Sequence, residues 1–298
     1  MKLVTTFGWA LLSMSSVLSQ EVAVKTYQLA REEAPLPVGR KFLTKAKNSG
    51  KDAAITLQFG DREIQGTMNT LEVRERLYEF PEEGGIRISI LKDQKNMEMV
   101  LDGGKLPPKE LVKATVGKVI FLGMKEGKWL GQLAGEGLQE DGNEEVNSEI
   151  EKLEKVYNSQ KSKSEKMFGL KPRAVGERWD VDATLMPGID GFDVTGGKFT
   201  LQLKEVKEFQ GELCAVIETT FDVKALSNEE DKKGMTMNLR GSGRIVRSLD
   251  LLFDLKETGE AQFEMEGNVP PPAPPNAMMK TVGRMTMESR MTEVKEGE

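Results

Sequence analysis

The chain has 298 residues, with 42 Lys and Arg against 48 Asp and Glu, no His and one Cys. Without His, the Ser-His-Asp and Cys-His nucleophiles and the His-containing zinc and iron sites are excluded. One Cys cannot form an intrachain disulfide or a four-cysteine metal site, and a formal charge of −6 argues against a general nucleic-acid binder.

The first residues have the pattern of a secretory signal. Lys2 precedes an apolar stretch from Leu3 to Leu12, and Val17 and Ser19 stand at the −3 and −1 positions of a cleavage site. We expect a signal peptide at 1–19 and a protein exported to the bacterial periplasm or the extracellular space. A membrane anchor would need about 20 apolar residues. No later segment approaches that length, so we expect no stable membrane span after cleavage.

Most of the chain alternates apolar and polar residues, which is typical of antiparallel sheets with one face on a core. Gly-containing turns separate the runs. The expected strand segments are 55–59, 86–90, 97–99, 199–203, 235–239, 251–255, 263–265 and 285–287. The expected turns are at 83–85, 102–104, 125–128, 195–197 and 258–259. These patterns predict a mainly β protein.

One segment has helical periodicity instead. Val146, Ile150, Leu153 and Tyr157 are spaced by 4, 3 and 4 residues, and Asp141 and Glu144 fit a capping box. We expect an amphipathic helix within a connector at 141–168. The segment 107–112 begins with two prolines and could open a short second helix.

A short pattern occurs twice. Residues 35–42 (PLPVGRKF) match residues 172–179 (PRAVGERW), and Thr56-Leu57-Gln58 occurs again as Thr200-Leu201-Gln202. We interpret this as an N-terminal β unit (20–140) and a C-terminal β unit (169–298) on either side of the helix. The units form either two related sheets or one curved sheet, and chance recurrence is the alternative.

The segment 270–275 (PPPAPP) has five prolines in six residues, so it cannot belong to a central strand. We expect a surface polyproline loop that acts as a spacer between two strands. A recognition site for a proline-binding partner is the alternative.

The chemically suggestive residues have ordinary structural explanations. Cys214 lies in an apolar run beside Glu212 and Glu218, which would raise its pKa. Asp180 and Asp182 lie beside Trp179, would share one face of a strand and could line a sugar site, but an exposed face beside a core tryptophan is the simpler explanation. Residues 190–193 lack the calcium ligands of an EF-hand loop, and Gly241-Ser242-Gly243 indicates a strand bend or bulge. We therefore predict no catalytic, cofactor-binding or metal-binding residues.

Methionines are frequent, with 16 in the chain against three Trp. Those on period-two positions are Met97, Met99, Met235, Met237, Met285, Met287 and Met291. Because Met is flexible and polarisable, a Met-lined concave sheet could hold a lipid or an apolar peptide. An ordinary methionine-filled β core is the alternative.

The layout resembles a group of secreted bacterial β-rich proteins with no assigned activity. The features that it shares with them are the signal peptide, Val38-Gly39 and Val175-Gly176 opening each half, the charged helix, and a segment like 204–217. It is also similar to envelope proteins with a β half-barrel, some of which carry lipids. This resemblance implies a half-barrel-like sheet.

We expect an exported, non-enzymatic protein that binds an apolar ligand such as a lipid, or a protein of the envelope. The open alternatives are a carboxylate-based hydrolase of polysaccharide and a structural or interaction module.

Overall fold

The computed structural model describes residues 24–32, 36–134, 144–186, 192–228, 234–269 and 276–295, except for the side chains of 159–163. The predicted signal peptide (1–19) and polyproline loop (270–275) lie outside the described residues. The same is true of Asp141 in the predicted capping box and of residues 190 and 191.

The fold is built on one 13-stranded sheet, in which every neighbouring pair is antiparallel. Its order is β10-β11-β12-β13-β14-β15-β2-β3-β4-β7-β8, with β5 and β6 also paired to β4. The long strands are β2 (Lys41–Phe59), β3 (Arg62–Glu79), β4 (Ile86–Leu101), β11 (Phe192–Phe209), β12 (Glu212–Ser227), β13 (Thr236–Ser248), β14 (Asp254–Asn268) and β15 (Met278–Glu293). The short ones are β5 (Gly104–Lys105), β6 (Lys109–Val112), β7 (Val119–Lys125), β8 (Lys128–Leu133) and β10 (Arg178–Val181). Two further short strands, β1 (Thr26–Tyr27) and β9 (Arg173–Ala174), pair with each other.

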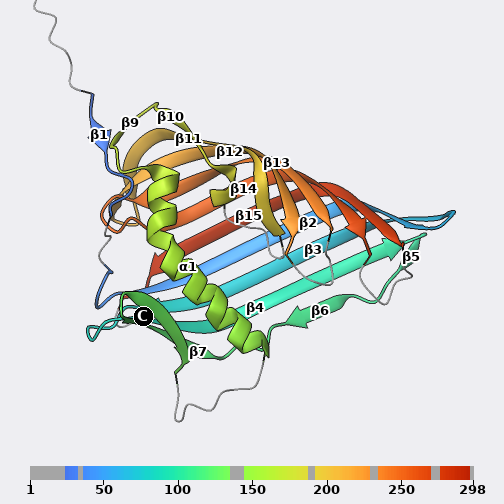
Figure 1. Cartoon of the computed structure of the whole chain (residues 1–298), viewed down its shortest axis with the longest axis horizontal. Coiled ribbons are helices and arrows are strands. Elements are labelled where there is room, and N and C mark those ends of the chain that lie inside the picture. Colours follow the sequence, from blue (N-terminus) through green and yellow to red (C-terminus); the bar gives the residue numbers. More distant parts are fainter. Residues whose placement is uncertain are drawn as a thin grey trace, which may run out of the picture.

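The prediction of a mainly β protein with antiparallel sheets and a helix is confirmed. The first and second halves of the chain are joined because β15 pairs with β2 from Met278 to Glu293. Of the two arrangements left open by the sequence, the structure has one continuous curved sheet. In the described part of the chain, β10 and β8 are the two edge strands of the sheet and do not pair with each other, so the sheet is open. It has the shape of a trough (Figure 1).

Glycines on the concave side allow neighbouring strands to approach closely. A Cβ atom at Gly241 would lie 2.2 Å from the carbonyl oxygen of Glu260, and one at Gly243 would lie 2.8 Å from that of Thr258. The register between β13 and β14 is continuous here, and Gly243 pairs with Gly259. Gly241-Ser242-Gly243 is therefore a smooth part of a strand where neighbouring backbones approach closely, and not a bulge.

The helix α1 (Glu144–Phe168) lies in the mouth of the trough (Figure 1). Its 25 residues give it a length of about 37 Å. It contacts β8 at one edge of the sheet and the short helix η1 (Ala183–Leu185), just beyond β10, at the other. The helix thus bridges the gap between the two sheet edges. Glu144 and Glu145 in its first turn and Lys166 in its last turn complement the helix dipole.

Two hydrophobic clusters hold the helix against the sheet. The first half of α1 packs through Ile150, Leu153 and Tyr157 onto a cluster built from Ile86, Ile88, Ile90, Ile120 and Leu122. The end of α1 packs through Met167 and Phe168 onto a larger cluster that includes Leu201, Leu203, Ile217 and Ile245. The helical positions predicted as apolar thus face the concave side of the sheet.

Three expectations about local structure were wrong. Residues 109–112 form β6 and not a helix. Strand β7 pairs only with Ile86–Ser89 of β4, which leaves the rest of that edge of β4 open, and β6 pairs there with residues 94–97. Of the predicted strand 251–255, residues 254 and 255 belong to β14, whereas residues 251–253 precede it outside any strand and Leu252 has a φ of 57°. The glycines at 195–197 and 258–259 lie inside β11 and β14, where the first group forms a bulge.

The repeated Val-Gly pattern produces the same turn twice. Gly39 has a φ of 77° and donates its N–H to Phe80 O, while Phe80 donates to Arg40 O. Gly176 has a φ of 92° and donates to Leu203 O, while Leu203 donates to Glu177 O. The repeated Thr-Leu-Gln sequence does not occupy corresponding strands. Thr56 lies in β2, the first strand after the Gly39 turn, whereas Thr200 lies in β11, the second strand after the Gly176 turn.

Candidate functional site

A set of methionines lies together on the concave side of the sheet. We call Met68, Met97, Met99, Met265, Met279, Met285 and Met287 the methionine face. The register places Met68 opposite Met99, Met285 opposite Ala261, and Met287 opposite Gly259. Met265, Met279, Met285 and Met287 pack against the cluster that includes Met167 and Phe168 of α1. The methionine face is therefore on the same side of the sheet as the helix.

The methionines predicted from the sequence divide into three groups. Met97, Met99, Met285 and Met287 are half-buried members of the methionine face. Met235 and Met237 are core residues, with 1% and 6% of their surface exposed. Met291 packs in the same hydrophobic cluster as Phe42 and Phe253. Four of the predicted positions thus line the trough. Met68, Met265 and Met279, which were not in the predicted set, join them.

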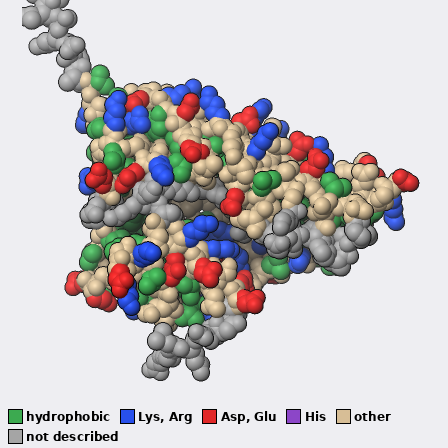
Figure 2. Space-filling model, viewed as in Figure 1, with side chains coloured by type: hydrophobic (Ala, Val, Ile, Leu, Met, Phe, Trp, Pro, Cys, Tyr) green, Lys and Arg blue, Asp and Glu red, His purple; other side chains and the backbone are tan. Residues whose placement is uncertain are grey.

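The methionine face is long enough for a hydrocarbon chain. Met287 and Met279 are eight residues apart on β15, a distance of about 26 Å along the strand. A single acyl chain spans about 15 Å, half of the hydrocarbon core of a bilayer. Figure 2 shows this side of the molecule hollowed near its middle, with Lys and Arg side chains beside the hollow. The seven methionines are apolar and half-buried, which suits an extended apolar ligand.

A network of charged side chains borders the methionine face. Its centre is Asp93 on β4, which is only 2% exposed and lies 3.7–3.8 Å from the cationic nitrogens of Arg74, Arg76 and Lys113. Arg76 also pairs with Glu149 of α1 at 2.6 Å. Burial raises the pKa of Asp93, and the three cations oppose that rise. The network joins the helix to the sheet floor.

This network also holds buried polar atoms that no hydrogen bond satisfies. They are Asp93 Oδ2, Arg76 Nε and Thr44 Oγ1, from three neighbouring strands. Buried polar atoms usually have a partner, so a polar group or water would be stabilised here. Asp93 and Met97 are on the same side of β4, about 13 Å apart along the strand. The trough therefore has a polar region next to an apolar one.

A second network fixes the other end of α1. Arg247 on β13 is 4% exposed and donates to Leu29 O at 2.9 Å, Asp254 Oδ1 at 2.6 Å and Ser164 Oγ at 2.9 Å. Its guanidinium lies 4.2 Å from the ring centroid of Phe168. Burial and the neighbouring Asp254 raise the pKa of Glu257 to about 7, while Arg247 lowers it. One arginine thus connects the N-terminal segment, the helix and two strands.

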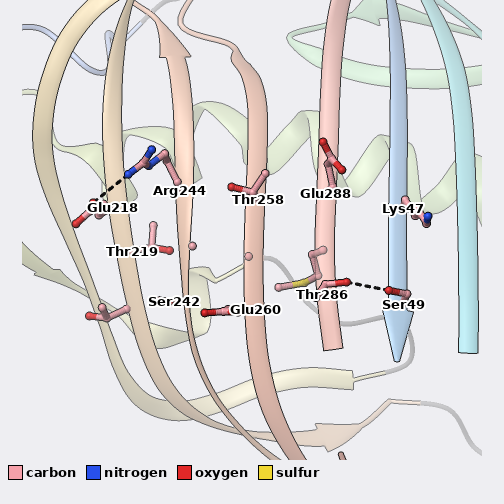
Figure 3. Close-up of a pocket in the computed structure, with 14 residues that line it drawn as sticks. Lys47, Ser49, Glu218, Thr219, Ser242, Arg244, Thr258, Glu260, Thr286 and Glu288 are labelled. Carbon is pink, nitrogen blue, oxygen red and sulfur yellow. Dashed lines mark hydrogen bonds and ion pairs between the residues drawn. The ribbon is translucent and has the colours of Figure 1, made fainter. Parts of the chain in front are cut away.

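The opposite side of the sheet is polar. Figure 3 shows a shallow depression there, with α1 behind the sheet. It has a volume of about 670 Å³ and is crossed by a 2.8 Å hydrogen bond between Ser49 and Thr286. Glu218 pairs with Lys204 and with Arg244, both at 3.3 Å, and the hydrogen bond from Lys204 is the main cause that lowers the pKa of Glu218. Its short side chains and paired charges are typical of a solvated surface.

The acids suggested for sugar chemistry have structural contacts. Asp180 accepts a hydrogen bond from Thr200, and Asp182 caps η1 by accepting from the N–H of Thr184. The hydrogen bonds from Thr184 lower the pKa of Asp182. Trp179 packs beside the larger core cluster and donates its indole N–H to Met167 O at 3.0 Å. Trp179 thus attaches β10 to the end of α1, while Asp180 connects β10 to β11 and Asp182 caps η1.

Cys214 is fully buried with Val246 and Leu255. Burial raises the pKa of its thiol to about 11, with further contributions from Glu212 and Asp250. Glu212 raises the pKa of Cys214, as the sequence predicted. The second acid that raises it is Asp250 and not Glu218. A thiol of this pKa stays protonated at neutral pH.

Within the described ranges, no helix has the length and apolarity needed to cross a membrane. The same residues contain no group of three or more Asp, Glu or Cys side chains placed to hold a metal ion.

No family model and no curated protein matches the chain. Among solved structures, a lipovitellin structure, titled for lipid–protein interactions, matches 89% of this chain with 9% identity and a TM-score of 0.38. The chain spans 26% of that protein. Pseudomonas aeruginosa OccK1 and the binding domain of botulinum neurotoxin serotype C1 each match 86% of this chain, with identities of 7% and 6% and TM-scores of 0.16 and 0.14. The alignments cover 99% and 84% of those two chains. All three TM-scores are low, so the function must be inferred from the chain itself.

Proposed function

We propose that the trough binds the acyl chain of a lipid-like molecule on the methionine face, in a non-enzymatic role. The observation that carries the proposal is the presence of seven half-buried methionines on the concave side of one sheet. Fully buried side chains would indicate a packed core, as Met235 and Met237 do. Half-buried ones leave apolar surface that a ligand can cover.

The chemistry of methionine supports a chain-like ligand of variable shape. Its unbranched side chain has three rotatable bonds and a polarisable sulfur, so it adapts to irregular apolar surfaces. Phe263 on β14 and Leu57 on β2 extend the same apolar side of the sheet. Binding there would remove apolar area from water, which contributes about 25 cal/mol for each Å².

The two faces of the sheet differ in a way that favours one binding side. Ser49, Thr220, Ser242 and Thr286 give the convex side a polar character. The concave side has apolar residues next to the Asp93 network, so it matches an amphiphile with one polar end. In that network, Asp93 Oδ2 would accept a hydrogen bond from the polar end, and Arg76 Nε would donate one to it.

Export is part of this proposal and rests on the N-terminal sequence, which has the pattern of a signal peptide. A lipid or a lipid-bearing component of the cell envelope would then be the natural ligand. Mass spectrometry of the N-terminus of the protein recovered from a bacterial host tests this part. We expect the chain to begin at Gln20, and a retained 1–19 segment in the recovered protein would contradict it.

Ligand binding is tested by purifying the protein under native conditions and measuring its mass by native mass spectrometry. Organic extraction of the same sample identifies what is bound. We expect one or more lipid-sized adducts that are lost on unfolding. A protein that carries no adduct, and that acquires none after incubation with mixed fatty acids and phospholipids, would contradict lipid binding.

A further inference from the structure

One segment of the trough edge combines exposed apolar side chains with lysines. We call residues 104–113 the rim segment; it includes β5 and β6, which pair with β4 along the lower edge in Figure 1. Leu106, Leu111 and Val112 are 41%, 46% and 60% exposed. Lys105, Lys109 and Lys113 alternate with them in the sequence, and Glu110 is the one acid among these ten residues.

The rim segment is directly attached to the methionine face. Lys109 pairs with Met97, and Leu106 donates its N–H to Met99 O at 2.9 Å. A ligand that leaves the methionine face over this edge would therefore pass the rim segment first. The exposed leucines and valine would extend the apolar path up to the edge.

The charge of the rim segment contrasts with the charge of the whole protein. From 104 to 113 there are three lysines and one glutamate, whereas the chain as a whole has a formal charge of −6. Lys113 pairs with the buried Asp93, while Lys105 is 65% exposed and lies 4.0 Å from the exposed Glu98. Glu110 accepts a hydrogen bond from Gln94 at 2.6 Å. Lysines beside exposed apolar residues bind to membrane surfaces that carry anionic lipids, because the two kinds of contact act together.

Edge protection alone explains only part of this composition. Lysines and prolines on an edge strand prevent pairing with other chains, which accounts for the lysines and for Pro107 and Pro108. It does not account for three large apolar side chains exposed in the same ten residues. Leu111 pairs with Lys95 and Val112 with Gln94, so the two point to opposite sides of β6. An edge that enters a lipid interface needs apolar groups on both of its sides.

We propose that the rim segment docks the protein onto anionic lipid surfaces, with Leu106, Leu111 and Val112 entering the interface and Lys105 and Lys109 contacting the headgroups. This inference rests on the proposed function, because docking would place the open trough beside the lipids that it binds. The docked edge would be the side on which ligand enters and leaves.

The test is flotation with vesicles of phosphatidylcholine alone or with 30% phosphatidylglycerol added. We expect the wild-type chain to float with the anionic vesicles and to be released as salt rises, because salt screens the lysine contacts. Two rim variants carry the changes Leu106→Ser, Leu111→Ser and Val112→Ser, or Lys105→Glu and Lys109→Glu. Each variant should bind the anionic vesicles at least tenfold more weakly than the wild type does.

Two control variants, each with two substitutions, place the same kinds of change on exposed residues away from the rim. One carries Leu226→Ser and Val282→Ser, which are both 45% exposed on the convex side, and the other carries Lys51→Glu and Lys224→Glu. These should bind anionic vesicles as the wild type does. Wild-type protein that does not float with anionic vesicles, or rim variants that bind as well as the controls, would overturn the inference.

A second readout separates this inference from the proposed function. Binding of a fluorescent fatty acid in solution, without vesicles, reports on the methionine face alone. We expect the rim variants to bind the fatty acid like the wild type. Vesicle binding without fatty-acid binding would contradict the proposed function and leave membrane docking standing. Fatty-acid binding without vesicle binding would contradict docking alone.

Discussion

Asn158 on α1 forms a reciprocal pair of hydrogen bonds with the backbone of Trp129 on β8. The Trp129 N–H donates to Asn158 Oδ1 at 2.8 Å, and Asn158 Nδ2 donates to Trp129 O at 2.9 Å. Two residues further along β8, the N–H of Gly131 donates to Glu154 at 2.6 Å. Helix side chains thus occupy backbone groups that an edge strand normally leaves open, and they stop the edge from pairing with another chain.

This contact predicts that Asn158→Ala destabilises the protein although alanine favours helices. Both backbone groups of Trp129 would lose their partners, at a cost of about 0.5–1.5 kcal/mol for each hydrogen bond. Urea unfolding measures the effect. Glu151→Ala on the exposed side of the same helix is the control and should change the free energy of unfolding by less than about 0.5 kcal/mol. Equal effects of the two substitutions would contradict the role of Asn158.

Arg247 should be more important than any single helix contact. Its replacement by Met removes the bonds to Leu29, Asp254 and Ser164 and leaves Asp254 without its cation. Breaking a buried pair in this way costs about 3–5 kcal/mol. We expect a large loss in the free energy of unfolding for Arg247→Met, together with increased hydrogen exchange in residues 164–168. A loss below about 1 kcal/mol would mean that the network does not hold the helix end.

The raised pKa of Glu257 predicts how stability depends on pH. In the unfolded chain this carboxyl titrates near 4.3, whereas in the folded protein its pKa is about 7. Between these values the folded state binds more protons, so the free energy of unfolding falls as the pH rises from about 4.5 to about 7. Glu257→Gln should reduce this fall by about 1–3 kcal/mol. Parallel pH profiles for the two proteins would contradict the assignment.

The close approach of β13 and β14 predicts that Gly241→Ala is destabilising. The added methyl group would contact Glu260 O and the ring of Phe221, which lies 2.7 Å from the Cβ position. Overpacking of this kind costs about 1–3 kcal/mol. Gly196→Ala is the control, because no atom lies within 4 Å of its Cβ position. Thermal unfolding of both variants decides the point, and a Gly241→Ala protein as stable as the control would show that the strands are not constrained there.

The sequence predicted the elements better than their connections. The stripe of Val146, Ile150 and Leu153 predicted the helix, and period-two alternation predicted that Met97 and Met99 share a face. Glycines were harder to interpret, because Gly259 is flanked by turn-like residues but lies inside β14, opposite Gly243 of β13. Glycine is typical both of tight turns and of places where strands approach closely, and only the position of the neighbouring backbone distinguishes the two.

The charged networks could not be predicted, since their partners are far apart in the chain. Arg247 meets Leu29 and Ser164, which are 218 and 83 residues away. The available signal was an arginine directly after the apolar pair Ile245-Val246, which says nothing about its partners. Asp93 likewise gains its surroundings from β3, α1 and the segment before β7.

The most direct test of lipid binding compares two adjacent residues on opposite sides of β3. Met68 faces the trough, whereas Thr67 is exposed on the other side. Titration of a fluorescent fatty acid into wild type, Met68→Glu and Thr67→Glu should show affinity reduced at least tenfold for Met68→Glu. For Thr67→Glu the affinity should stay within about twofold of wild type, because only the first substitution places a charge against the acyl chain. Equal affinities of the two folded variants, or a wild-type protein that does not bind the probe, would contradict the account.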